Sequence, residues 1–320
     1  METSEKDNII FSHSPVMPNE CIEGLNIRPG GTIVDGTAGG GGHSYLIAES
    51  LNVGRLIAID RDESAIRAAG KRLERFGDTV LFARNNFVNI AEVCHSFGID
   101  KIDGVLLDLG VSSYQLDTPE RGFSYISDAP LDMRMDQNAE KTAYDVVNGY
   151  TESELRRILF EYGEEKFAAR IAANIVKQRE KSPIKTTGEL VEIIRRSVPQ
   201  TQKGGGHPAK RTFQAIRIEV NGELEVIEPA IRSAVDLLNV GGRIAIITFH
   251  SLEDRIVKQT FADLASGCIC PKDLPVCVCG RKPIIKLVNK KPILPSAEEL
   301  ENNPRSHSAK LRIAEKIQET

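Results

Sequence analysis

The sequence lacks several features that would place it in other broad classes of protein. It has no tryptophan, only 5% of its residues are aromatic, and it shows no internal repeat and no low-complexity tract. No apolar run approaches the ~18 residues that a membrane-spanning helix needs. The first eight residues are polar with charges of both signs, so no signal peptide is visible. We therefore expect a soluble cytoplasmic protein that does not enter the membrane.

The overall charge gives little indication of a partner, but the charges are unevenly distributed. The 320 residues carry a net charge of −4. Residues 115–165 hold 12 acidic and 5 basic side chains, residues 166–212 hold 3 and 11, and residues 281–312 hold 3 and 8. Basic clusters of this kind bind phosphate backbones, and they also cover ordinary solvated helix faces. Both interpretations remain open at this point.

A glycine-rich segment carries most of the functional information. A short β-branched run ends in Asp35, four glycines follow at Gly39–Gly42, and a helical pattern starts at Ser44. Such a turn brings backbone N–H groups against a ligand at the start of a helix. A second strand pattern ends in Asp60, where a carboxylate commonly binds ribose hydroxyls. This arrangement predicts a nucleoside-cofactor site, and the alternative is a tight strand–helix turn without a ligand.

The cofactor can be narrowed further from the same residues. Dinucleotide sites use G-x-G-x-x-G, and no register of these glycines supplies all three positions. Asp35 would repel a pyrophosphate, whereas it suits a cationic ligand such as the ammonium group of S-adenosylmethionine (SAM). The sequence therefore favours SAM over NAD.

The order of secondary-structure patterns predicts an α/β fold. Strand patterns at residues 32–35, 55–60, 79–83 and 104–109 alternate with helical patterns at 44–50 and 63–76. From about residue 112 to 212 the patterns are helical, with capping boxes at Thr151 and Thr186 and a helix at 164–180. A long helical pattern at 209–238 leads back to strands at 242–249, 284–288 and 309–314. We expect a Rossmann-like, doubly wound SAM-binding domain (residues 1–112 and 213–320) interrupted by a helical substrate-recognition domain (113–212).

Asp108 follows the fourth predicted strand and should face the reactive end of the cofactor. Amino-methyltransferases usually carry (Asn/Asp)-Pro-Pro-(Tyr/Phe) at this position, where an acceptor side chain and a backbone carbonyl hold the target NH₂. Asp108 supplies an acceptor, but the prolines and the aromatic residue are missing. The alternative is that Asp108 caps a helix or a turn.

Seven motifs in this order resemble the ribosomal RNA small subunit methyltransferase H family, and the similarity runs from about residue 12 to 315. They are Asp35-Gly-Thr-Ala-Gly-Gly-Gly-Gly-His-Ser44, Asp108-Leu-Gly-Val-Ser-Ser113, Arg121-Gly-Phe-Ser124, Leu131-Asp-Met-Arg-Met135, His207-Pro-Ala-Lys-Arg-Thr-Phe-Gln-Ala215, Phe249-His-Ser-Leu-Glu-Asp-Arg255 and Asn303-Pro-Arg-Ser306.

The resemblance implies a class I methyltransferase that uses SAM to methylate N4 of a cytidine in the decoding centre of 16S rRNA. The implied partner is the small ribosomal subunit, and dimerisation is a family-level expectation. Asp108 is the candidate catalytic residue. The implied cofactor contacts are Gly41, Gly42, His43, Asp60, Phe87, Asp108 and Gln115. Because the Pro-Pro-aromatic signature is missing, a non-catalytic nucleotide- or RNA-binding protein on the same fold is the alternative.

Three further groups of residues have two interpretations each. Ser251-x-x-Asp254 follows the 242–249 strand and either caps a helix, which we favour, or takes part in catalysis. Asp132 and Arg134 either clamp the target base or pair with each other. His207 opens the return helix, where it and the bases that follow could bind a phosphate.

The six cysteines divide into isolated Cys21 and Cys94 and a cluster of four, Cys268-x-Cys270 and Cys277-x-Cys279. Four thiols this close could bind zinc tetrahedrally. C-x-C spacing is less typical of zinc sites than C-x₂-C, and reduced thiols are common in cytoplasmic enzymes. From the sequence alone we expect no metal.

Overall fold

The computed structural model describes residues 14–199, 207–268, 270 and 278–319, which form two compact units. The first unit comprises Met1–Gly110 and Glu225–Thr320, and the second comprises Val111–Leu224. Each unit has its own hydrophobic core. None of the described helices is long and apolar enough to cross a membrane.

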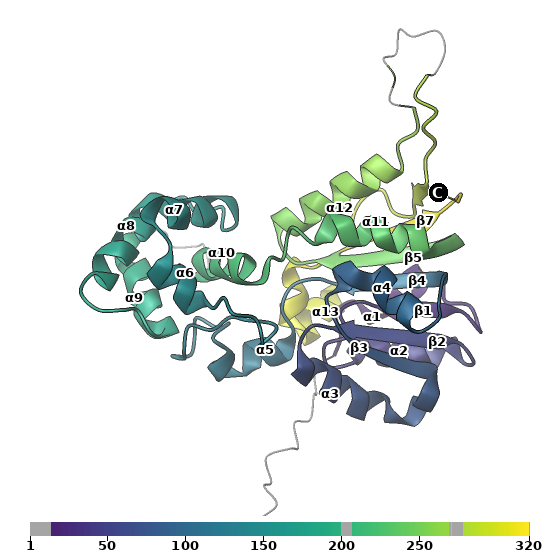
Figure 1. Cartoon of the computed structure of the whole chain (residues 1–320), viewed down its shortest axis with the longest axis horizontal. Coiled ribbons are helices and arrows are strands. Elements are labelled where there is room, and N and C mark those ends of the chain that lie inside the picture. The colour runs from purple at the N-terminus through teal and green to yellow at the C-terminus, as the bar shows by residue number, and fades with distance from the viewer. Residues whose placement is uncertain (1–13, 200–206, 269, 271–277, 320) are drawn as a thin grey trace, which may run out of the picture. The chain divides into compact units, whose positions relative to one another are not determined.

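Among the described residues, the first unit contains one sheet of seven strands in the order β3-β2-β1-β4-β5-β7-β6 (Figure 1). Neighbouring strands from β3 to β5 pair in parallel, and β7 pairs antiparallel with β5 and β6. The strands are β1 (Thr32–Asp35), β2 (Arg55–Asp60), β3 (Val80–Arg84), β4 (Ile102–Asp108), β5 (Leu238–Thr248), β6 (Ile285–Leu287) and β7 (Lys310–Lys316). The strand order reverses between β1 and β4, the position where open α/β sheets bind ligands outside their carboxyl ends. The predicted α/β fold is confirmed.

The central strands are buried because helices cover both faces of the sheet. Ile33 and Val34 of β1 and the run Leu56–Ile59 of β2 are at most 1% exposed, and such continuous apolar runs are typical of parallel strands between two helical layers. One layer contains α1 (Pro18–Leu25), α2 (Gly42–Leu51) and α3 (Glu63–Leu73), and the other contains α4 (Ile90–Ser96), α11 (Ile227–Leu237) and α12 (Ser251–Leu264). Short 3₁₀ segments among the described residues span Glu74–Thr79, which is broken at Gly77, and Phe87–Asn89, Pro119–Arg121 and Pro304–Ser308.

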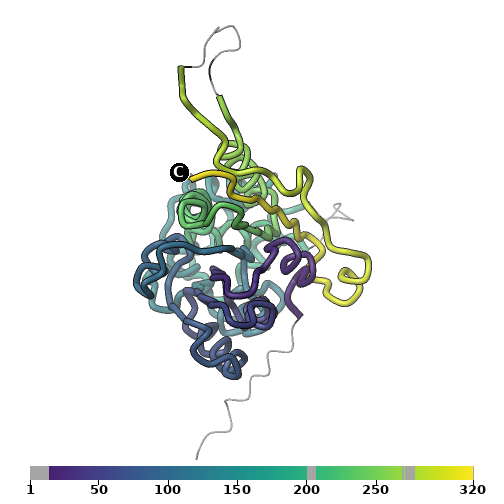
Figure 2. Tube along the Cα trace, turned by 90° about the vertical axis from the view of Figure 1, so that its right-hand side faces the viewer, coloured from purple at the N-terminus to yellow at the C-terminus, as the bar shows by residue number. Residues whose placement is uncertain are grey.

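Segments near the two ends of the described part of the chain lie side by side in the first unit. α1 lies beside the segment that holds α13 (Ala297–Asn302), as the purple and yellow traces in Figure 2 show. The backbone N–H of Met17 donates to Oε1 of Glu299 at 3.1 Å. Residues from the two sequence segments of this unit therefore hold one domain together, and the helical unit Val111–Leu224 is inserted between those segments in the sequence.

The second unit is helical. Its helices are α5 (Ser113–Asp117), α6 (Ala143–Gly149), α7 (Glu152–Glu161), α8 (Ala168–Arg179), α9 (Thr187–Ser197) and α10 (Lys210–Asn221). The predicted capping boxes at Thr151 and Thr186 are confirmed, with Glu154 and Glu189 as their partners. The apolar faces of these helices form one core, to which α7 contributes Leu155, Ile158 and Leu159.

The long helix predicted at 209–238 is wrong, because the chain forms α10 and α11 with a break between them. Gly222 ends α10 with a positive φ of 59°, a left-handed conformation that a continuing helix excludes. The periodicity alone did not reveal this, since apolar residues recur at helical spacing on both sides of the glycine.

The observed units also differ from the predicted boundary at residue 212. α10 belongs to the helical unit, because its buried face, which includes Phe213 and Ile216, is part of the helical core. The strand predicted from residue 242 likewise begins earlier, at Leu238, which pairs with Ile102 of β4.

Candidate active site

Three aspartates end neighbouring parallel strands of the first unit. Asp35 ends β1, Asp60 ends β2 and Asp108 ends β4, and β1 pairs with both of the other strands. Burial is the largest cause that raises the pKa of each carboxyl, and for Asp60 and Asp108, whose pKa values rise to about 6, the charge on Asp35 is a further cause. Buried acids that raise one another's pKa form a site that favours a cation and disfavours an additional anion.

Asp35 holds the glycine-rich loop in place. It is fully buried, its Oδ2 accepts from the Ser44 hydroxyl at 2.6 Å, and its Oδ1 accepts from the Thr37 N–H at 3.1 Å. The Thr37 hydroxyl in turn accepts from the Asp108 N–H at 2.6 Å, which ties β1 to β4. Asp35 therefore fixes the loop between β1 and α2 by these two hydrogen bonds.

The loop itself needs its glycines for packing and for backbone geometry. Gly41 precedes α2 with a φ of 76°, and a Cβ at this position would lie 3.2 Å from the Cα of Ala69 in α3. Gly42 is the first residue of α2, and a Cβ there would lie 3.2 Å from Cβ of Pro15. The loop therefore packs between α3 and the N-terminal segment. It places the N-terminus of α2 at the edge of the sheet formed by the carboxyl ends of the parallel strands, where the three acids lie. That end of a helix attracts a negatively charged group.

Asp60 already accepts two backbone hydrogen bonds and has capacity for more. Its Oδ2 accepts from the Gly39 N–H and its Oδ1 from the Asp62 N–H, each at 2.8 Å. Each carboxylate oxygen can accept two hydrogen bonds, so one position on each oxygen remains for a ligand. This carboxylate is suited to a vicinal diol, and its bonds to Gly39 couple the diol position to the glycine loop.

Phe87 lies next to this loop, whereas Gln115 belongs to the other unit, and the role of Phe87 as a cofactor contact remains a prediction. A Cβ on Gly36 would lie 3.1 Å from Cβ of Phe87, so the aromatic side chain starts beside the first turn of the loop. Gln115 is 4% exposed, and its Oε1 accepts from the Ser112 N–H at 3.0 Å in the capping box of α5. Its role as a cofactor contact remains a prediction.

Asp108 faces a histidine that is itself held by the backbone. Nε2 of His43 lies 2.8 Å from the carbonyl oxygen of Val16, and Nδ1 lies 3.7 Å from Oδ2 of Asp108. A carbonyl can only accept, so Nε2 is the donor and Nδ1 is the ring nitrogen that faces the carboxylate. Oδ1 of Asp108 is buried and has no hydrogen-bond partner among the described residues.

Beyond β5, sequence reasoning placed the helix cap on the wrong residue. Ser251 is already the first residue of α12, and His250 is the cap, with its Nδ1 accepting from the Glu253 N–H at 3.4 Å. Glu253 completes the capping box, because its Oε2 accepts from the N–H groups of Phe249 and His250. The sequence prediction chose Ser251 because Ser and Thr are preferred helix caps. The signal for the true cap was Glu253, the glutamate three residues after His250.

The same capping box adds a fourth acid to this edge. Glu253 is 1% exposed, and its charge raises the pKa of Asp108. Its Oε1 also lies 3.0 Å from Nε2 of His250, but the direction of approach is not that of a hydrogen bond. Phe249 is half-buried beside the chain that leaves β4, since a Cβ on Gly110 would lie 3.6 Å from its Cδ2. An aromatic ring therefore lies beside Gly110, two residues after Asp108.

Several other candidates are structural within the second unit. Asp132 and Arg134 pair with each other through two hydrogen bonds, at 2.9 and 2.7 Å. His207 stacks on Tyr125 with ring centroids 4.6 Å apart, and Arg211 donates to the carbonyl oxygen of Glu164. These contacts support the interpretation that Asp132 and Arg134 pair with each other. The ring of His207 is held by its stacking on Tyr125.

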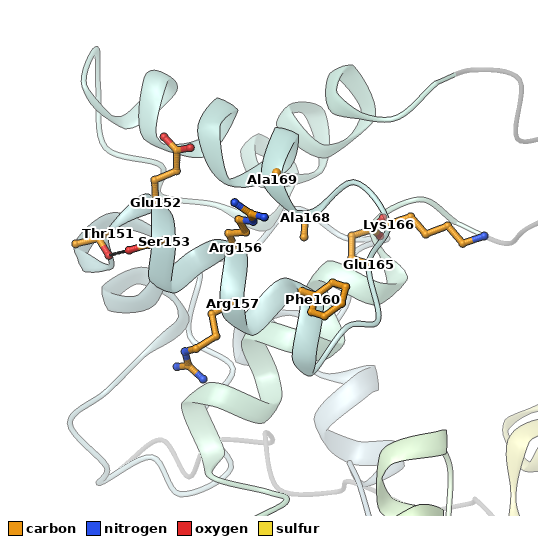
Figure 3. Close-up of a pocket in the computed structure, with 10 residues that line it drawn as sticks. All are labelled: Thr151, Glu152, Ser153, Arg156, Arg157, Phe160, Glu165, Lys166, Ala168 and Ala169. Atoms are coloured by element: carbon orange, nitrogen blue, oxygen red, sulfur yellow. Dashed lines mark hydrogen bonds between the residues drawn. The ribbon is translucent and has the colours of Figure 1, made fainter.

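An open groove of about 890 Å³ lies on the second unit between α7 and α8 (Figure 3). Arg156 and Lys166 are exposed along it, and the ring of Phe160 is 68% exposed. Arg157 also lines the groove but pairs with Glu161 at 3.2 Å. Arg156 belongs to the stretch that is acidic in sequence, so the fold brings it together with a base from the stretch that is basic. Two cations beside an exposed aromatic ring are suited to a nucleic acid strand.

The basic stretch 166–212 is less uniform than its composition suggests. Arg195 and Arg196 are exposed at the end of α9, but Arg195 donates to Glu192 at 3.0 Å. Arg179 donates to the carbonyl oxygen of Val147. Lys203 lies outside the described residues. Part of this positive charge therefore stabilises the helical unit.

The chain is similar in sequence to a family of methylases and to individual named relatives. The model of the MraW methylase family matches residues 10–317. The chain is 55% identical over 309 residues to the ribosomal RNA small subunit methyltransferase H of Finegoldia magna and 57% identical to that of Clostridioides difficile, in each case covering 96% of this chain and 99% of the relative. Among solved structures, an rRNA methylase from Streptococcus thermophilus aligns over 94% of both chains with 12% identity and a TM-score of 0.42.

Proposed function

Because the chain belongs to the MraW methylase family, we propose that it is an rRNA methyltransferase that transfers the methyl group of SAM to N4 of a cytidine in 16S rRNA of the small ribosomal subunit. The observation that carries this proposal is the set of buried carboxylates at the ends of β1, β2 and β4 around the glycine loop. SAM has a sulfonium and an ammonium group, and the acids provide the charge that such a cation needs.

The residues at this edge fit the parts of SAM in order. Asp60 has one acceptor position on each oxygen for the two ribose hydroxyls, and Phe87 offers an apolar surface for the adenine. The N-terminus of α2, at Gly41 and Gly42, suits the carboxylate of the methionine part. The buried charge of Asp35 favours the neighbouring ammonium group.

Asp108 is the residue that we assign to the target base. Methyl transfer is an in-line displacement: N4 forms a bond to the methyl carbon, the bond to sulfur breaks, and the sulfonium becomes a neutral thioether. The lone pair of N4 is delocalised into the cytosine ring, and acceptors for its N–H groups would turn that lone pair towards the methyl group. Oδ1 of Asp108, which has no partner among the described residues, is such an acceptor.

The product amine must lose a proton after transfer, and the Asp108–His43 pair can receive it. At neutral pH Asp108 is a carboxylate, because its pKa is about 6. A proton that arrives on this carboxylate meets the lone pair of His43 Nδ1, 3.7 Å from Oδ2. Val16 fixes the orientation of the ring through its carbonyl oxygen. The pair then holds the proton away from the methylated base.

We assign rRNA binding to the groove between α7 and α8. Arg156 and Lys166 would hold phosphates, and Phe160 would stack on an unpaired base, which is the usual way in which proteins bind single-stranded RNA. This deepens the prediction that the helical insertion recognises the substrate, and within the basic stretch 166–212 it assigns the phosphate contact to Lys166 and not to Arg195 and Arg196 at the end of α9.

The decisive experiment is transfer of label from methyl-tritiated SAM to small ribosomal subunits, followed by nucleoside analysis. We expect N4-methylcytidine with the unmodified chain and a large loss of kcat with Asp108→Asn, which removes the charge and keeps the shape. Label on another nucleoside would refute the cytosine-N4 assignment. SAM binding without any transfer, to subunits or to naked rRNA, would instead support the non-catalytic RNA-binding alternative.

A further inference from the structure

The cysteines of this chain fall into two structural classes. Cys21 and Cys94 are fully buried in the first unit, as is usual for cysteine, and burial raises the pKa of both thiols. Cys268 is exposed and Cys270 is half-buried, in the loop that follows α12. An exposed cluster of thiols contributes nothing to a hydrophobic core, so packing does not account for these residues.

Three sulfur atoms come together from the two described arms of this loop, which are residues 265–268 with 270 and residues 278–284. The ligand atoms of Cys268, Cys270 and Cys279 all lie within 4.8 Å of one another, and Sγ of Cys279 lies 3.7 Å from Sγ of Cys268. A disulfide has an S–S distance of about 2.05 Å, so these two atoms are not bonded. Zinc binds thiolates at about 2.3 Å, which places two sulfurs of a tetrahedron about 3.8 Å apart. The observed separation matches the edge of a tetrahedral zinc–thiolate site.

The backbone supports the same interpretation. The N–H of Cys270 points to Sγ of Cys268 at 3.4 Å. Hydrogen bonds of this kind orient the ligand atoms of metal sites. The bond therefore joins two of the three cysteines whose sulfur atoms lie within 4.8 Å of one another.

The loop also has a structural need for a metal. Its base is closed where Arg281 pairs with Asp263 at 2.7 Å and the Ile284 N–H donates to the carbonyl oxygen of Leu264 at 2.9 Å. Beyond that base, Val278 is 76% exposed, so burial of its apolar side chain does not hold the arms together. In Figure 1 the two described arms extend from the end of α12. Small extensions without a core commonly depend on a structural metal.

We propose that Cys268, Cys270 and Cys279 bind a structural Zn²⁺ ion that joins the two arms of this loop. Cys277, the fourth cysteine of the sequence cluster, lies outside the described residues. The site reverses the expectation of no metal that we drew from the C-x-C spacing, because spacing along the chain does not show that two arms meet. It is also separate from methyl transfer: α12 has 14 residues, and at 1.5 Å per residue its length places the loop roughly 20 Å from His250.

Metal analysis of the full chain, purified with a reductant and with zinc in the medium, tests the site directly. We expect one zinc per chain, and loss of this zinc in Cys268→Ser and in Cys279→Ser. The matched control is Cys94→Ala, which removes a buried cysteine and should retain the metal. Zinc retained in both serine variants, or no stoichiometric zinc in the unmodified chain, would overturn the proposal, and so would iron with acid-labile sulfide in its place.

Two measurements on the unmodified chain keep the test independent of how the variants fold. Titration of the metal-free chain with Co²⁺ should give thiolate-to-cobalt charge-transfer absorption and tetrahedral d–d bands, which zinc then abolishes. Chelation should speed trypsin cleavage between α12 and β6 without changing SAM affinity. A cobalt spectrum without thiolate absorption, or a loop whose cleavage rate does not respond to the metal, would contradict a zinc–thiolate site at these cysteines.

Discussion

Replacing Asp60 with alanine tests the assignment of the ribose position. The substitution removes both carboxylate oxygens, each of which keeps one acceptor position for a ligand while accepting a backbone N–H at 2.8 Å. Hydrogen bonds to a charged acceptor contribute on the order of 1.5–3 kcal/mol. At about 1.4 kcal/mol per factor of ten, the Kd for SAM should rise roughly 10- to 100-fold. Isothermal titration calorimetry of the folded variant measures this directly.

Two control variants separate a lost ligand contact from a disturbed loop. Asp60→Asn keeps the shape of the side chain and one oxygen acceptor for Gly39 or Asp62, so it should preserve the loop and still weaken SAM binding. Asp62→Ala removes the cap that accepts from Ser64 at the start of α3, which costs about 0.5–2 kcal/mol of stability. SAM affinity should change far less in that variant than in Asp60→Ala, because Oδ1 of Asp62 accepts from the Ser64 N–H and the side chain acts on Asp60 through its charge. If Asp60→Ala binds SAM like the unmodified chain, then Asp60 is not the ribose ligand.

Three further predictions follow from the same structure. Asp60 and Asp108 have pKa values raised to about 6, so they lose their charge as the pH falls through 6. A bound cation lowers both pKa values, so SAM binding at pH 6 should release protons. Calorimetry in buffers of different ionisation enthalpy detects this release, and equal heats of binding in all buffers would exclude it. The double variant Arg156→Ala, Lys166→Ala should lower the slope of log K against log salt concentration for subunit binding by roughly 1.4–1.8, at about 0.7–0.9 per lost phosphate contact. An unchanged slope in this variant, together with a lower slope in the double variant Arg195→Ala, Arg196→Ala, would show that the RNA binds at α9 instead. Gly222→Ala should destabilise the chain by about 1–2 kcal/mol, because its φ is 59°; thermal unfolding measures this, and equal or greater stability would show that the break between α10 and α11 does not need glycine.

The raised pKa values of Asp60 and Asp108 have opposite consequences for the stability of the ligand-free chain and for SAM binding. In the ligand-free chain the two carboxyls have raised pKa values, so the stability that they contribute is fully present below the unfolded pKa, near 3.9, and is lost as the pH rises through about 6. SAM binding has the opposite dependence, because it needs the charged form. Lowering the pH from 7.5 to 5 should therefore weaken SAM binding without destabilising this edge of the sheet.

The parts of the fold that the sequence predicted share a simple physical origin. β1 and β2 were located to the residue because continuous apolar runs end in an acid or begin after a glycine turn. The capping boxes at Thr151 and Thr186 were found because both partners lie within one turn of the helix. Local signals of this kind depend on a few neighbouring residues, so a single sequence contains them.

The parts that the sequence did not predict depend on contacts between distant segments. His43 meets Asp108 from another strand and Val16 from the N-terminal segment, and neither distance follows from spacing along the chain. The groove joins Arg156 and Lys166 across two stretches of opposite net charge. The helix cap was misplaced for a different reason: Ser251 is the better cap by preference, but α12 begins at Ser251, one residue earlier than a cap at Ser251 would allow.

The charge at the strand ends also explains why this loop should discriminate between cofactors. Raising the pKa of Asp108 from 3.8 to about 6 corresponds to about 3 kcal/mol of preference for its neutral form, an upper limit because solvent reaches 24% of the side chain. A cation at this edge removes that penalty, whereas the two negative charges of a pyrophosphate would increase it. Asp35 and Glu253, fully buried behind the edge, act in the same direction because solvent screens them little. We therefore expect NAD to fail to compete with SAM even at millimolar concentration, and competition that strengthens at neutral pH would contradict this account of the site.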